Sequence, residues 1–313
     1  MKICVLGAGA MGSSIGGLLA DGGSEVCLID TWAEHVDAIN SRGLKLRVGP
    51  SEKVVRIRAA TDCREIGPAD LIIVLVKSFH TGEAIENAGP IIGDETAIIS
   101  FQNGLGNEEI IGDVAGRKHV LGGRTFAGGS VLGPGYVVAN TAGKTTYIGE
   151  LDGTTTERVT RIAEEFKRAG LLITVSSNII GVMWDKLLVN IATGAFCGIT
   201  RLPFGGLYKI PELRDCALAA VAEGIAVAKA IGVKLSTKDP GEAWFKASEG
   251  LPEDFKPSLL QDLEKGLRTE IDFINGAVVR YGEKYKVPTP VNRTLVACIK
   301  GIEYRITHYA KKA

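Results

Sequence analysis

The length, composition and charge of the chain exclude several classes of protein before any motif is considered. Its 313 residues are about twice the length of a usual single domain, which predicts two domains that each bury a core. With 45% hydrophobic and 23% charged residues, the composition is that of a globular protein and not of a disordered, fibrous or disulfide-rich one. The 36 basic residues balance the 36 acidic residues, so we expect neither nucleic acid nor an anionic membrane as a partner.

The first half of the chain has the pattern of strands that alternate with helices. Residues 2–6 (KICVL) form an apolar run typical of a strand buried on both faces, residues 11–19 suit a helix packed on a sheet, and residues 25–29 (EVCLI) form a second strand. Further strands are expected at residues 54–57, 71–76, 97–100 and 119–121. This alternation favours a parallel, doubly wound sheet. The Gly- and Thr-rich stretch after Arg124 predicts an antiparallel extension of the same sheet.

The second half of the chain is predicted to be helical. From about Asn178 onward, apolar residues recur every three or four positions, as in amphipathic helices. The pattern is clearest over residues 213–231, and a second long helix is predicted over residues 258–285. We therefore predict one domain at residues 1–178 and a mainly α-helical domain at residues 179–313.

The cysteines and the apolar N-terminus favour a cytoplasmic protein. The six cysteines lie far apart and show no metal-ligand spacing, which is typical of reduced cysteines in a protein core, and we predict no metal site. Glycine spacing explains the opening apolar run better than a signal peptide does, and no later stretch holds the ~20 strongly apolar residues that a membrane span needs.

A glycine motif at the first strand predicts dinucleotide binding by the first domain. Gly7, Gly9 and Gly12 form G-x-G-x-x-G directly after a predicted strand, and Ala10 and Met11 open the helix whose N-terminal amides would bind a pyrophosphate. A Gly-rich turn of another α/β protein is the alternative.

The residue at the end of the second predicted strand bears on the choice of cofactor. Asp30 ends this strand, where a carboxylate can bind both ribose hydroxyls and repel a 2'-phosphate, so NAD(H) is favoured. Arg42 or Lys45 could still reach a phosphate, which leaves NADP(H) open.

Five segments in order resemble one family over essentially the whole chain. They are LGAGAMG at 6–12, VKSFHT at 76–81, QNGLGN at 102–107, WDKLLVN at 184–190 and SLLQDLEKGLRTEIDFINGAV at 258–278. The chain thereby resembles the 2-dehydropantoate 2-reductases (ketopantoate reductases). The resemblance implies a Rossmann-type domain, a C-terminal domain like that of 6-phosphogluconate dehydrogenase, and reduction of ketopantoate to D-pantoate for pantothenate and coenzyme A synthesis. The apolar C-terminal helices are expected to form a homodimer interface.

The resemblance also assigns roles to polar residues of the second half. Lys186 matches the catalytic lysine, which protonates the carbonyl oxygen, and the apolar residues around it predict burial of its stem. Asn190, one helical turn later, matches a substrate-binding asparagine. Glu270 matches a carboxylate that binds a substrate hydroxyl, Ser258 a serine that holds the substrate carboxylate, and Asp262 a polar position facing the site; by themselves, Asp262 and Glu270 would be solvated charges, eight apart on one helix.

Three further residues receive roles in the same way. Asn103, which follows a predicted strand, matches a residue that contacts cofactor and substrate, although Asn-Gly is also a common turn pair. Lys77 matches a lysine near the cofactor phosphates or ribose. Glu223 matches an acid that pairs with the catalytic lysine, but by itself it would be a surface residue.

Departures from the family pattern leave the 2-keto acid open. Gly194 and Phe204 stand where asparagines are expected, which predicts a less polar pocket. Together with Asp30 they favour an alternative, an NAD-dependent D-2-hydroxyacid dehydrogenase for branched or aromatic substrates such as D-mandelate. A non-catalytic nucleotide-sensing module is a third hypothesis. None of the four histidines has a catalytic context in the sequence.

Overall fold

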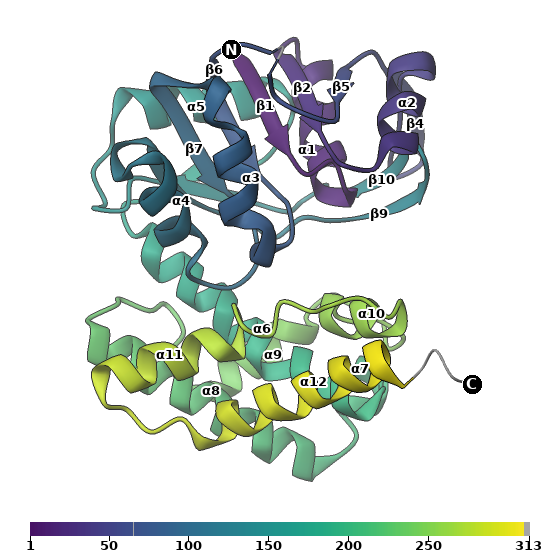
Figure 1. The fold of residues 1–313 in the computed structure, drawn as a ribbon. Helices are drawn as coiled ribbons and strands as arrows, with labels where there is room; N and C mark the ends of the chain where they lie inside the picture. Colours follow the sequence, from purple (N-terminus) through teal and green to yellow (C-terminus); the bar gives the residue numbers. More distant parts are fainter. Residues whose placement is uncertain (65, 310–313) are drawn as a thin grey trace. The chain divides into compact units, whose positions relative to one another are not determined.

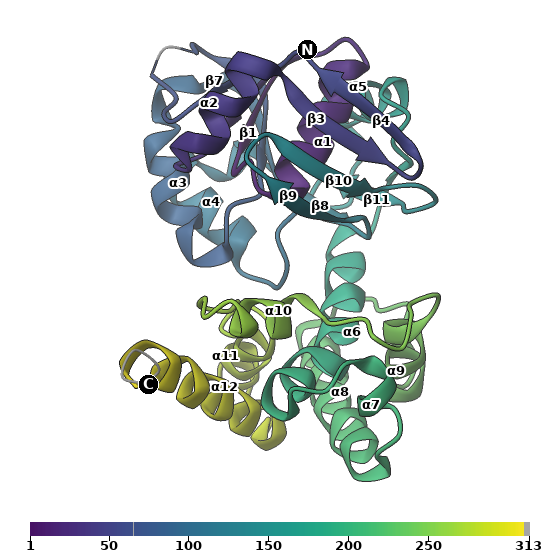
Figure 2. The ribbon, with the colours of Figure 1, turned by 90° about the vertical axis from the view of Figure 1, so that its right-hand side faces the viewer.

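The computed structural model describes residues 1–64 and 66–309, and the chain divides into two compact units. The first unit comprises Met1–Gln102 and Asn107–Ile179. The second begins at Ile180 and also includes the four residues Asn103–Gly106, which lie inside the first unit in sequence (Figures 1 and 2).

The main sheet of the first unit has eight strands in the order β12-β11-β8-β7-β6-β1-β2-β5. Their bounds are β1 Lys2–Leu6, β2 Glu25–Ile29, β5 Arg58–Ala60, β6 Ala69–Val74, β7 Ile92–Ser100, β8 Val120–Thr125, β11 Thr146–Gly149 and β12 Ile173–Val175. The six strands from β8 to β5 pair in parallel, which confirms the predicted Rossmann-type sheet. Because the chain turns from β2 and β5 back to β6, the strand order reverses at β1, where such sheets bind ligands.

Helices cover both faces of this sheet, which explains why β1 is apolar at every position but its first. Ile3 and Val5 join a core with α1 (Ala10–Asp21) and α5 (Glu157–Arg168). Cys4 and Leu6 point the other way, into a core with α3 (Thr81–Asn87) and α4 (Asn107–Ala115). Figure 1 shows α3 and α4 in front of the strands.

A second, four-stranded sheet corrects two predictions. It has the order β4-β3-β10-β9, with β3 Leu44–Val48, β4 Ser51–Val55, β9 Gly128–Gly133 and β10 Tyr136–Asn140. The expected strand at 54–57 therefore straddles the end of β4, and β5 is the strand that pairs with β2. Of the strands expected after Arg124, β11 does extend the main sheet antiparallel to β8, but β9 and β10 belong to the second sheet.

Glycines of α1 allow this helix to pack against both sheets, and α1 contacts strands of each (Figure 2). A Cβ on Gly16 would lie 2.5 Å from Leu28 of β2, and one on Gly17 would lie 2.8 Å from Leu44 of β3. Larger residues would separate α1 from one sheet or the other.

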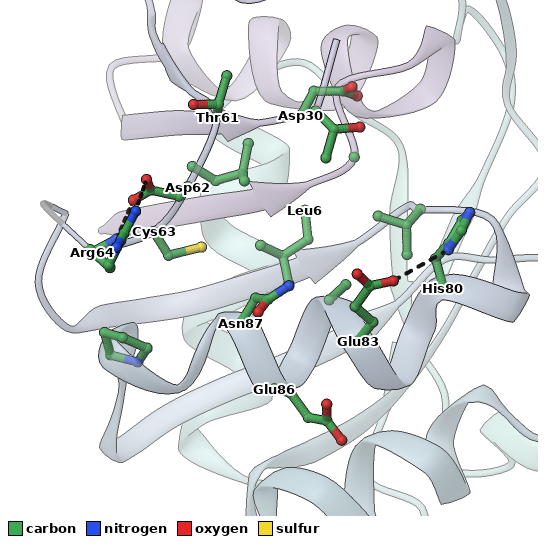
Figure 3. Close-up of a pocket in the computed structure, with 16 residues that line it drawn as sticks. Leu6, Asp30, Thr61, Asp62, Cys63, Arg64, His80, Glu83, Glu86 and Asn87 are labelled. Carbon is green, nitrogen blue, oxygen red and sulfur yellow. Dashed lines mark hydrogen bonds and ion pairs between the residues drawn. The ribbon is translucent and has the colours of Figure 1, made fainter. Parts of the chain in front are cut away.

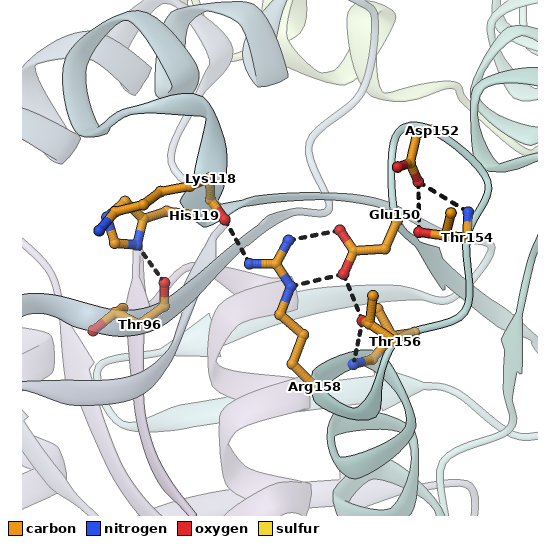
Figure 4. Close-up of polar contacts among 9 residues, drawn as sticks. Thr96, Lys118, His119, Glu150, Asp152, Thr154, Thr156 and Arg158 are labelled. Carbon is orange, nitrogen blue, oxygen red and sulfur yellow. Dashed lines mark hydrogen bonds and ion pairs between the residues drawn. The ribbon is translucent and has the colours of Figure 1, made fainter.

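A buried carboxylate ties the start of α5 to the sheet (Figure 4). Glu150 follows β11 and accepts two hydrogen bonds from Arg158, with Nε 2.7 Å from Oε1 and Nη2 2.6 Å from Oε2. Thr156 donates to Oε1 (2.6 Å), and Arg158 Nη1 also donates to the Lys118 carbonyl (2.5 Å). Burial favours a raised pKa, but the Arg158 and Thr156 hydrogen bonds outweigh it and hold the pKa of Glu150 below its usual value.

The second unit is helical, and its last predicted helix is broken. The helices are α6 Ile179–Thr200, α7 Phe204–Leu207, α8 Pro211–Ile231, α9 Pro240–Ser248, α10 Ser258–Glu264, α11 Asn275–Tyr285 and α12 Pro290–His308; α2, Ala33–Arg42, lies in the first unit. The prediction of one helix over 258–285 was wrong, because Gly266 has a φ of +71° and the Leu267 N–H returns to the Asp262 carbonyl (2.8 Å). Asp262 and Glu270 therefore do not share one helical face.

One helix among the described residues, α6, is long and apolar enough to cross a membrane. In its most apolar stretch, however, 67% of the residues are buried inside the protein. It is a core helix whose apolar residues face protein on most sides.

Candidate active site

The glycine loop that follows β1 has one open glycine between two constrained ones. Gly7 has a φ of +93°, and a Cβ there would lie 2.6 Å from the Val76 nitrogen. A Cβ on Gly12 would overlap the Gly7 carbonyl oxygen, whereas one on Gly9 would meet no atom of the described chain within 4 Å. The fold itself thus requires Gly7 and Gly12, and Gly9 leaves an open backbone surface for a ligand.

The N-terminus of α1 and Asp30 complete this half of the site. Gly9 is exposed, Ala10 and Met11 are half-buried, and no side chain of the described residues caps the helix. Asp30 Oδ2 accepts the Ala8 N–H (2.7 Å), and Oδ1 accepts the Trp32 N–H (2.9 Å). Uncapped amides attract phosphate. Each carboxylate oxygen also keeps a lone pair that can accept a hydrogen bond from a hydroxyl group.

A pocket of about 710 Å³ opens at the carboxyl ends of β1, β2 and β5. In Figure 3, Asp30 and Thr61 lie above it and Asn87 extends from α3 below. Its size is that of a small-molecule site. Arg64, on the rim, pairs with Asp62 (2.9 Å).

Of the three basic residues considered for phosphate binding, Lys77 lies next to a residue that lines this pocket, whereas Arg42 and Lys45 do not line it. Lys77 is half-buried at the start of a short helix, Ser78–His80, and follows Val76, which lines the pocket. Arg42 is exposed at the end of α2. Lys45 lies on β3, where it pairs with Glu52 (2.8 Å). Neither Arg42 nor Lys45 is among the described residues that line the pocket.

In the second unit, the neighbours of Lys186 anchor its helix. The ring of Trp184 is buried and lies 5.7 Å from the Tyr281 ring, between centroids. Asp185 accepts the backbone N–H groups of Ser236 (3.0 Å) and Thr237 (2.9 Å). Lys186, which directly follows these two anchored residues, is half-buried, as expected for a lysine with a covered stem.

The loop that follows β7 brings two predicted site residues together. Asn190, one turn after Lys186 on α6, donates from Nδ2 to Asn103 Oδ1 (3.4 Å). The Leu105 N–H donates to the Phe273 carbonyl (2.8 Å). Gly104 has a φ of +82°, and a Cβ there would overlap the same carbonyl oxygen. Backbone contact with Phe273 thus holds Asn103 beside the helix of Lys186.

The remaining predicted residues lie on α10 and in the turn before α11. Ser258 is exposed at the start of α10, whereas Asp262 and Glu270 are only 8% and 7% exposed. The Glu270 carbonyl accepts the N–H groups of Phe273 (2.9 Å) and Ile274 (3.1 Å). Both acids are buried, contrary to the alternative that they are solvated surface charges.

The packing bears on two expectations from the family pattern. Both oxygens of Glu223 bind the N-terminus of α12, through the N–H groups of Val291 (2.8 Å) and Asn292 (3.0 Å), so its carboxylate caps a helix. Phe204 is 4% exposed and stacks in an aromatic cluster whose nearest ring is Phe255, 5.0 Å away. Its ring is therefore covered by other side chains.

A buried polar cluster links two of the family segments and was not predicted. Gln102 Nε2 donates to the Val76 carbonyl and to Thr81 Oγ1, both at 2.8 Å. Thr81 in turn donates to Asn107 Oδ1 (3.0 Å). The signal for this cluster was the occurrence of these polar residues within VKSFHT and QNGLGN, but their pairing depends on tertiary contacts. Among the described residues, no group of three or more His, Cys, Asp or Glu side chains could hold a metal ion.

A Rossmann-type unit with an open glycine turn, followed by a helical unit with a lysine and polar side chains, defines a class of nicotinamide-dependent dehydrogenases. Comparison with known proteins narrows this class. The family model described as Ketopantoate reductase PanE/ApbA matches residues 3–153, and that for the C terminal matches residues 178–303. A 2-dehydropantoate 2-reductase of Pyrococcus horikoshii is 39% identical over 97% of this chain and 98% of its own length.

Solved structures agree with the sequence comparison. A ketopantoate reductase of Ralstonia eutropha has a TM-score of 0.90 at 33% identity and covers 98% of this chain and 100% of its own. D-mandelate dehydrogenase, with NADH and anilino(oxo)acetate, also has a TM-score of 0.90, at 28% identity over 98% of this chain and 99% of its own. The chain belongs to the ketopantoate reductase family of oxidoreductases, which confirms the resemblance found in the sequence.

Proposed function

We propose that this protein reduces ketopantoate to D-pantoate with a nicotinamide cofactor, on the route to pantothenate and coenzyme A. The observation that carries the proposal is the hydrogen bond between Asn103 and Asn190. It joins a loop at the carboxyl end of β7 to the helix that bears Lys186. A carbonyl reductase needs a proton donor close to the substrate carbonyl, and Lys186 on this helix can supply the proton.

The residues of the first unit fit a dinucleotide. The open surface at Gly9 and the uncapped amides of α1 would hold the pyrophosphate, and Asp30 would accept the ribose hydroxyls. Lys77 would lie near the phosphates or ribose. The bound cofactor supplies a hydride to the carbonyl carbon.

The residues of the second unit would bind the substrate and donate a proton to it. Lys186 would donate a proton to the carbonyl oxygen as negative charge develops there, so that a hydride and a proton together convert the ketone to an alcohol. Asn103 and Asn190 would orient the substrate through their amides. Ser258 would bind its carboxylate, and the buried Glu270, with Asp262 on α10, would bind its hydroxyl group.

Replacing Lys186 tests this proposal. We expect Lys186→Ala to lower kcat by about 10² to 10⁴, because the proton donor is lost from an otherwise intact site. The Kd for NADH, measured by fluorescence titration, should stay at the wild-type value. Lys229→Ala, an exposed position on α8, is the control and should keep full activity. Unchanged turnover in Lys186→Ala would contradict the assignment.

We also propose that NAD(H) is the preferred cofactor. Asp30 lines the pocket, and the Arg64 charge is already matched by Asp62. Asp30→Asn keeps an oxygen that can accept the Ala8 N–H but removes the charge that would repel a 2'-phosphate. The ratio of the KM values for NADPH and NADH should therefore fall in this variant. A wild-type enzyme that uses both cofactors equally would overturn the preference.

A D-2-hydroxyacid dehydrogenase is the second candidate. Gly194 supports it, because a Cβ there would lie 3.9 Å from Leu259 and would find ordinary room, so the missing side chain leaves space near Ser258. The structural likeness to D-mandelate dehydrogenase agrees with it. Comparing kcat/KM for ketopantoate, 2-ketoisovalerate and benzoylformate decides between the two. A clear preference for benzoylformate would replace the first proposal.

We further propose a cytoplasmic homodimer. Leu267 and Tyr304 are 51% and 57% exposed, and the segment that carries Leu267 lies along α12, where Thr269 donates to Glu303 (2.6 Å). Exposed apolar side chains at one place are typical of subunit contacts. Light scattering should give twice the mass of the 33.1 kDa chain, and Leu267→Asp should lower it to the mass of one chain. A wild-type monomer at micromolar concentration would contradict the dimer.

A further inference from the structure

A buried histidine in the first unit forms a chain of hydrogen bonds that ends at the glycine loop. His35, on α2, is 0% exposed. The Gly135 N–H donates to its Nδ1 (3.0 Å), and its Nε2 lies 3.1 Å from Ser13 Oγ. The Ser13 hydroxyl donates to the Ala8 carbonyl (2.6 Å), between Gly7 and Gly9 of the loop.

The donors in this chain determine where the proton of the imidazole lies. Since Gly135 offers an N–H, Nδ1 must accept, and a neutral His35 therefore carries its proton on Nε2. Nε2 then donates to Ser13 Oγ, whose own hydrogen is directed to Ala8. Burial lowers the pKa of His35, although the Asp30 carboxylate and the Ala8 backbone act in the opposite sense. The neutral form that the geometry needs is thus the form that the surroundings favour.

The peptide group between Ala8 and Gly9 connects these hydrogen bonds to the proposed dinucleotide site. Asp30 holds the Ala8 N–H (2.7 Å) while Ser13 holds its carbonyl, so both backbone polar groups of Ala8 are fixed. The Ala8 carbonyl and the Gly9 N–H share one planar trans peptide and point in opposite directions. Fixing the carbonyl toward Ser13 therefore directs the Gly9 N–H away from it, at the exposed glycine.

At the other end of these hydrogen bonds, His35 and Gly135 are also held by close packing. Gly135 lies in the turn between β9 and β10, with a φ of +72°, and a Cβ there would lie 2.9 Å from the Ala38 side chain of α2. The Trp32 ring stacks on His35, with 4.9 Å between centroids and an interplanar angle of 14°. Gly135, between β9 and β10, and the Trp32 ring thus both contact the imidazole.

We propose that His35, as the neutral Nε2–H tautomer, is a positioning residue for the cofactor: through Ser13 it orients the Ala8–Gly9 peptide so that the Gly9 N–H faces the pyrophosphate. This inference rests on the proposed binding of a dinucleotide by the first unit. It also gives the second sheet a role, since that sheet supplies the Gly135 N–H on which the tautomer depends.

Titration with NADH tests the role. Ser13→Ala and His35→Leu should each weaken NADH binding about fivefold or more, as loss of a net hydrogen bond of ~1 kcal/mol implies. Combined, they should weaken it little further, because both break one chain. His35→Gln places an amide nitrogen near the position of Nε2 and should restore most of the affinity. The kcat at saturating NADH should remain unchanged in all variants.

Controls separate this role from general stability and from the proposed function. His119→Gln alters another buried histidine of the same unit, which bonds the Thr96 carbonyl (2.7 Å), and should keep wild-type affinity. Wild-type NADH affinity in Ser13→Ala overturns the inference. So does a ¹⁵N spectrum that shows the Nδ1–H tautomer or an imidazolium at His35 at pH 7.5, a measurement that needs no variant. Failure of the wild-type protein to bind NADH or NADPH would instead defeat the proposed function.

Discussion

Two glycine-containing loops follow parallel strands of the same sheet, but they pack in different units. Gly7–Gly12, after β1, lies within the first unit, where Gly7 approaches Val76. Asn103–Gly106, after β7, belongs to the second unit, where Gly104 approaches Phe273. The Asp30 and Ser13 side chains bind the Ala8 peptide of the first loop, whereas the Leu105 backbone N–H binds the second loop to Phe273.

The difference shows that a glycine in a strand-end loop is required by whatever backbone lies against it. In the first loop, close packing leaves only Gly9 open, which suits a ligand. In the second loop, close packing brings Asn103 to Asn190. The same position in the sheet thus leaves open backbone in one case and brings two amide side chains together in the other.

The largest effect is expected from a matched pair in the first loop. Gly12→Ala should lower the free energy of unfolding by about 3 kcal/mol or more, because its methyl group would overlap backbone that cannot move aside. Gly9→Ala should change stability by less than about 0.5 kcal/mol but weaken NADH binding at least about tenfold. Urea denaturation and NADH titration measure both quantities. Equal free energies of unfolding for the two variants would contradict the conclusion that Gly12 is constrained and Gly9 is open.

A second pair tests the other loop. Gly104→Ala combines a positive φ with overlap of the Phe273 carbonyl, and we expect a loss of about 2 kcal/mol. Gly106→Ala has a φ of +107° but meets only the flexible end of Arg280, 3.4 Å away, so about 1 kcal/mol is expected. Activity should fall in parallel with stability, while affinity for NADH is kept. A larger loss in Gly106→Ala would be inconsistent with docking on Phe273.

The contact that the second loop provides can be measured by a double-mutant cycle. Asn103→Ala and Asn190→Ala should each lower kcat/KM for the keto acid. Because the two amides share one long hydrogen bond of 3.4 Å, their coupling energy should be about 1 kcal/mol or less. Independent effects that add fully would mean that the pair does not act as a unit.

The smallest effect is the contribution of His35 to the pH dependence of stability. The pKa of His35 is lowered in the native protein from its usual 6.5, chiefly by burial. Below pH 6.5, His35 therefore binds a proton in the unfolded chain but stays neutral in the native state. The free energy of unfolding thus falls as the pH drops toward the lowered native pKa. His35→Gln should flatten this part of the profile in urea denaturation between pH 8 and 5.5. An unchanged slope would show that His35 does not titrate on unfolding.

Much of the first unit follows from local pattern. The strands at 2–6 and 25–29 were predicted with their observed bounds, because β1 and β2 are short apolar runs. The glycine motif was recognisable because its spacing is itself a local pattern, and Gly12 meets the Gly7 backbone within one β-α-β unit. The order of five family segments likewise identified the family, since it is a property of the chain itself.

Contacts between residues far apart in sequence decided the rest. Glu223 caps α12, 68 residues later in the sequence. His35 depends on Gly135, 100 residues away, and Asn103 depends on the docking of its loop at Phe273. Periodicity and residue type report which side chains are apolar, charged or small. Only the folded backbone determines which distant partner each polar group finds, because the energy of a buried hydrogen bond depends on geometry that no local pattern contains.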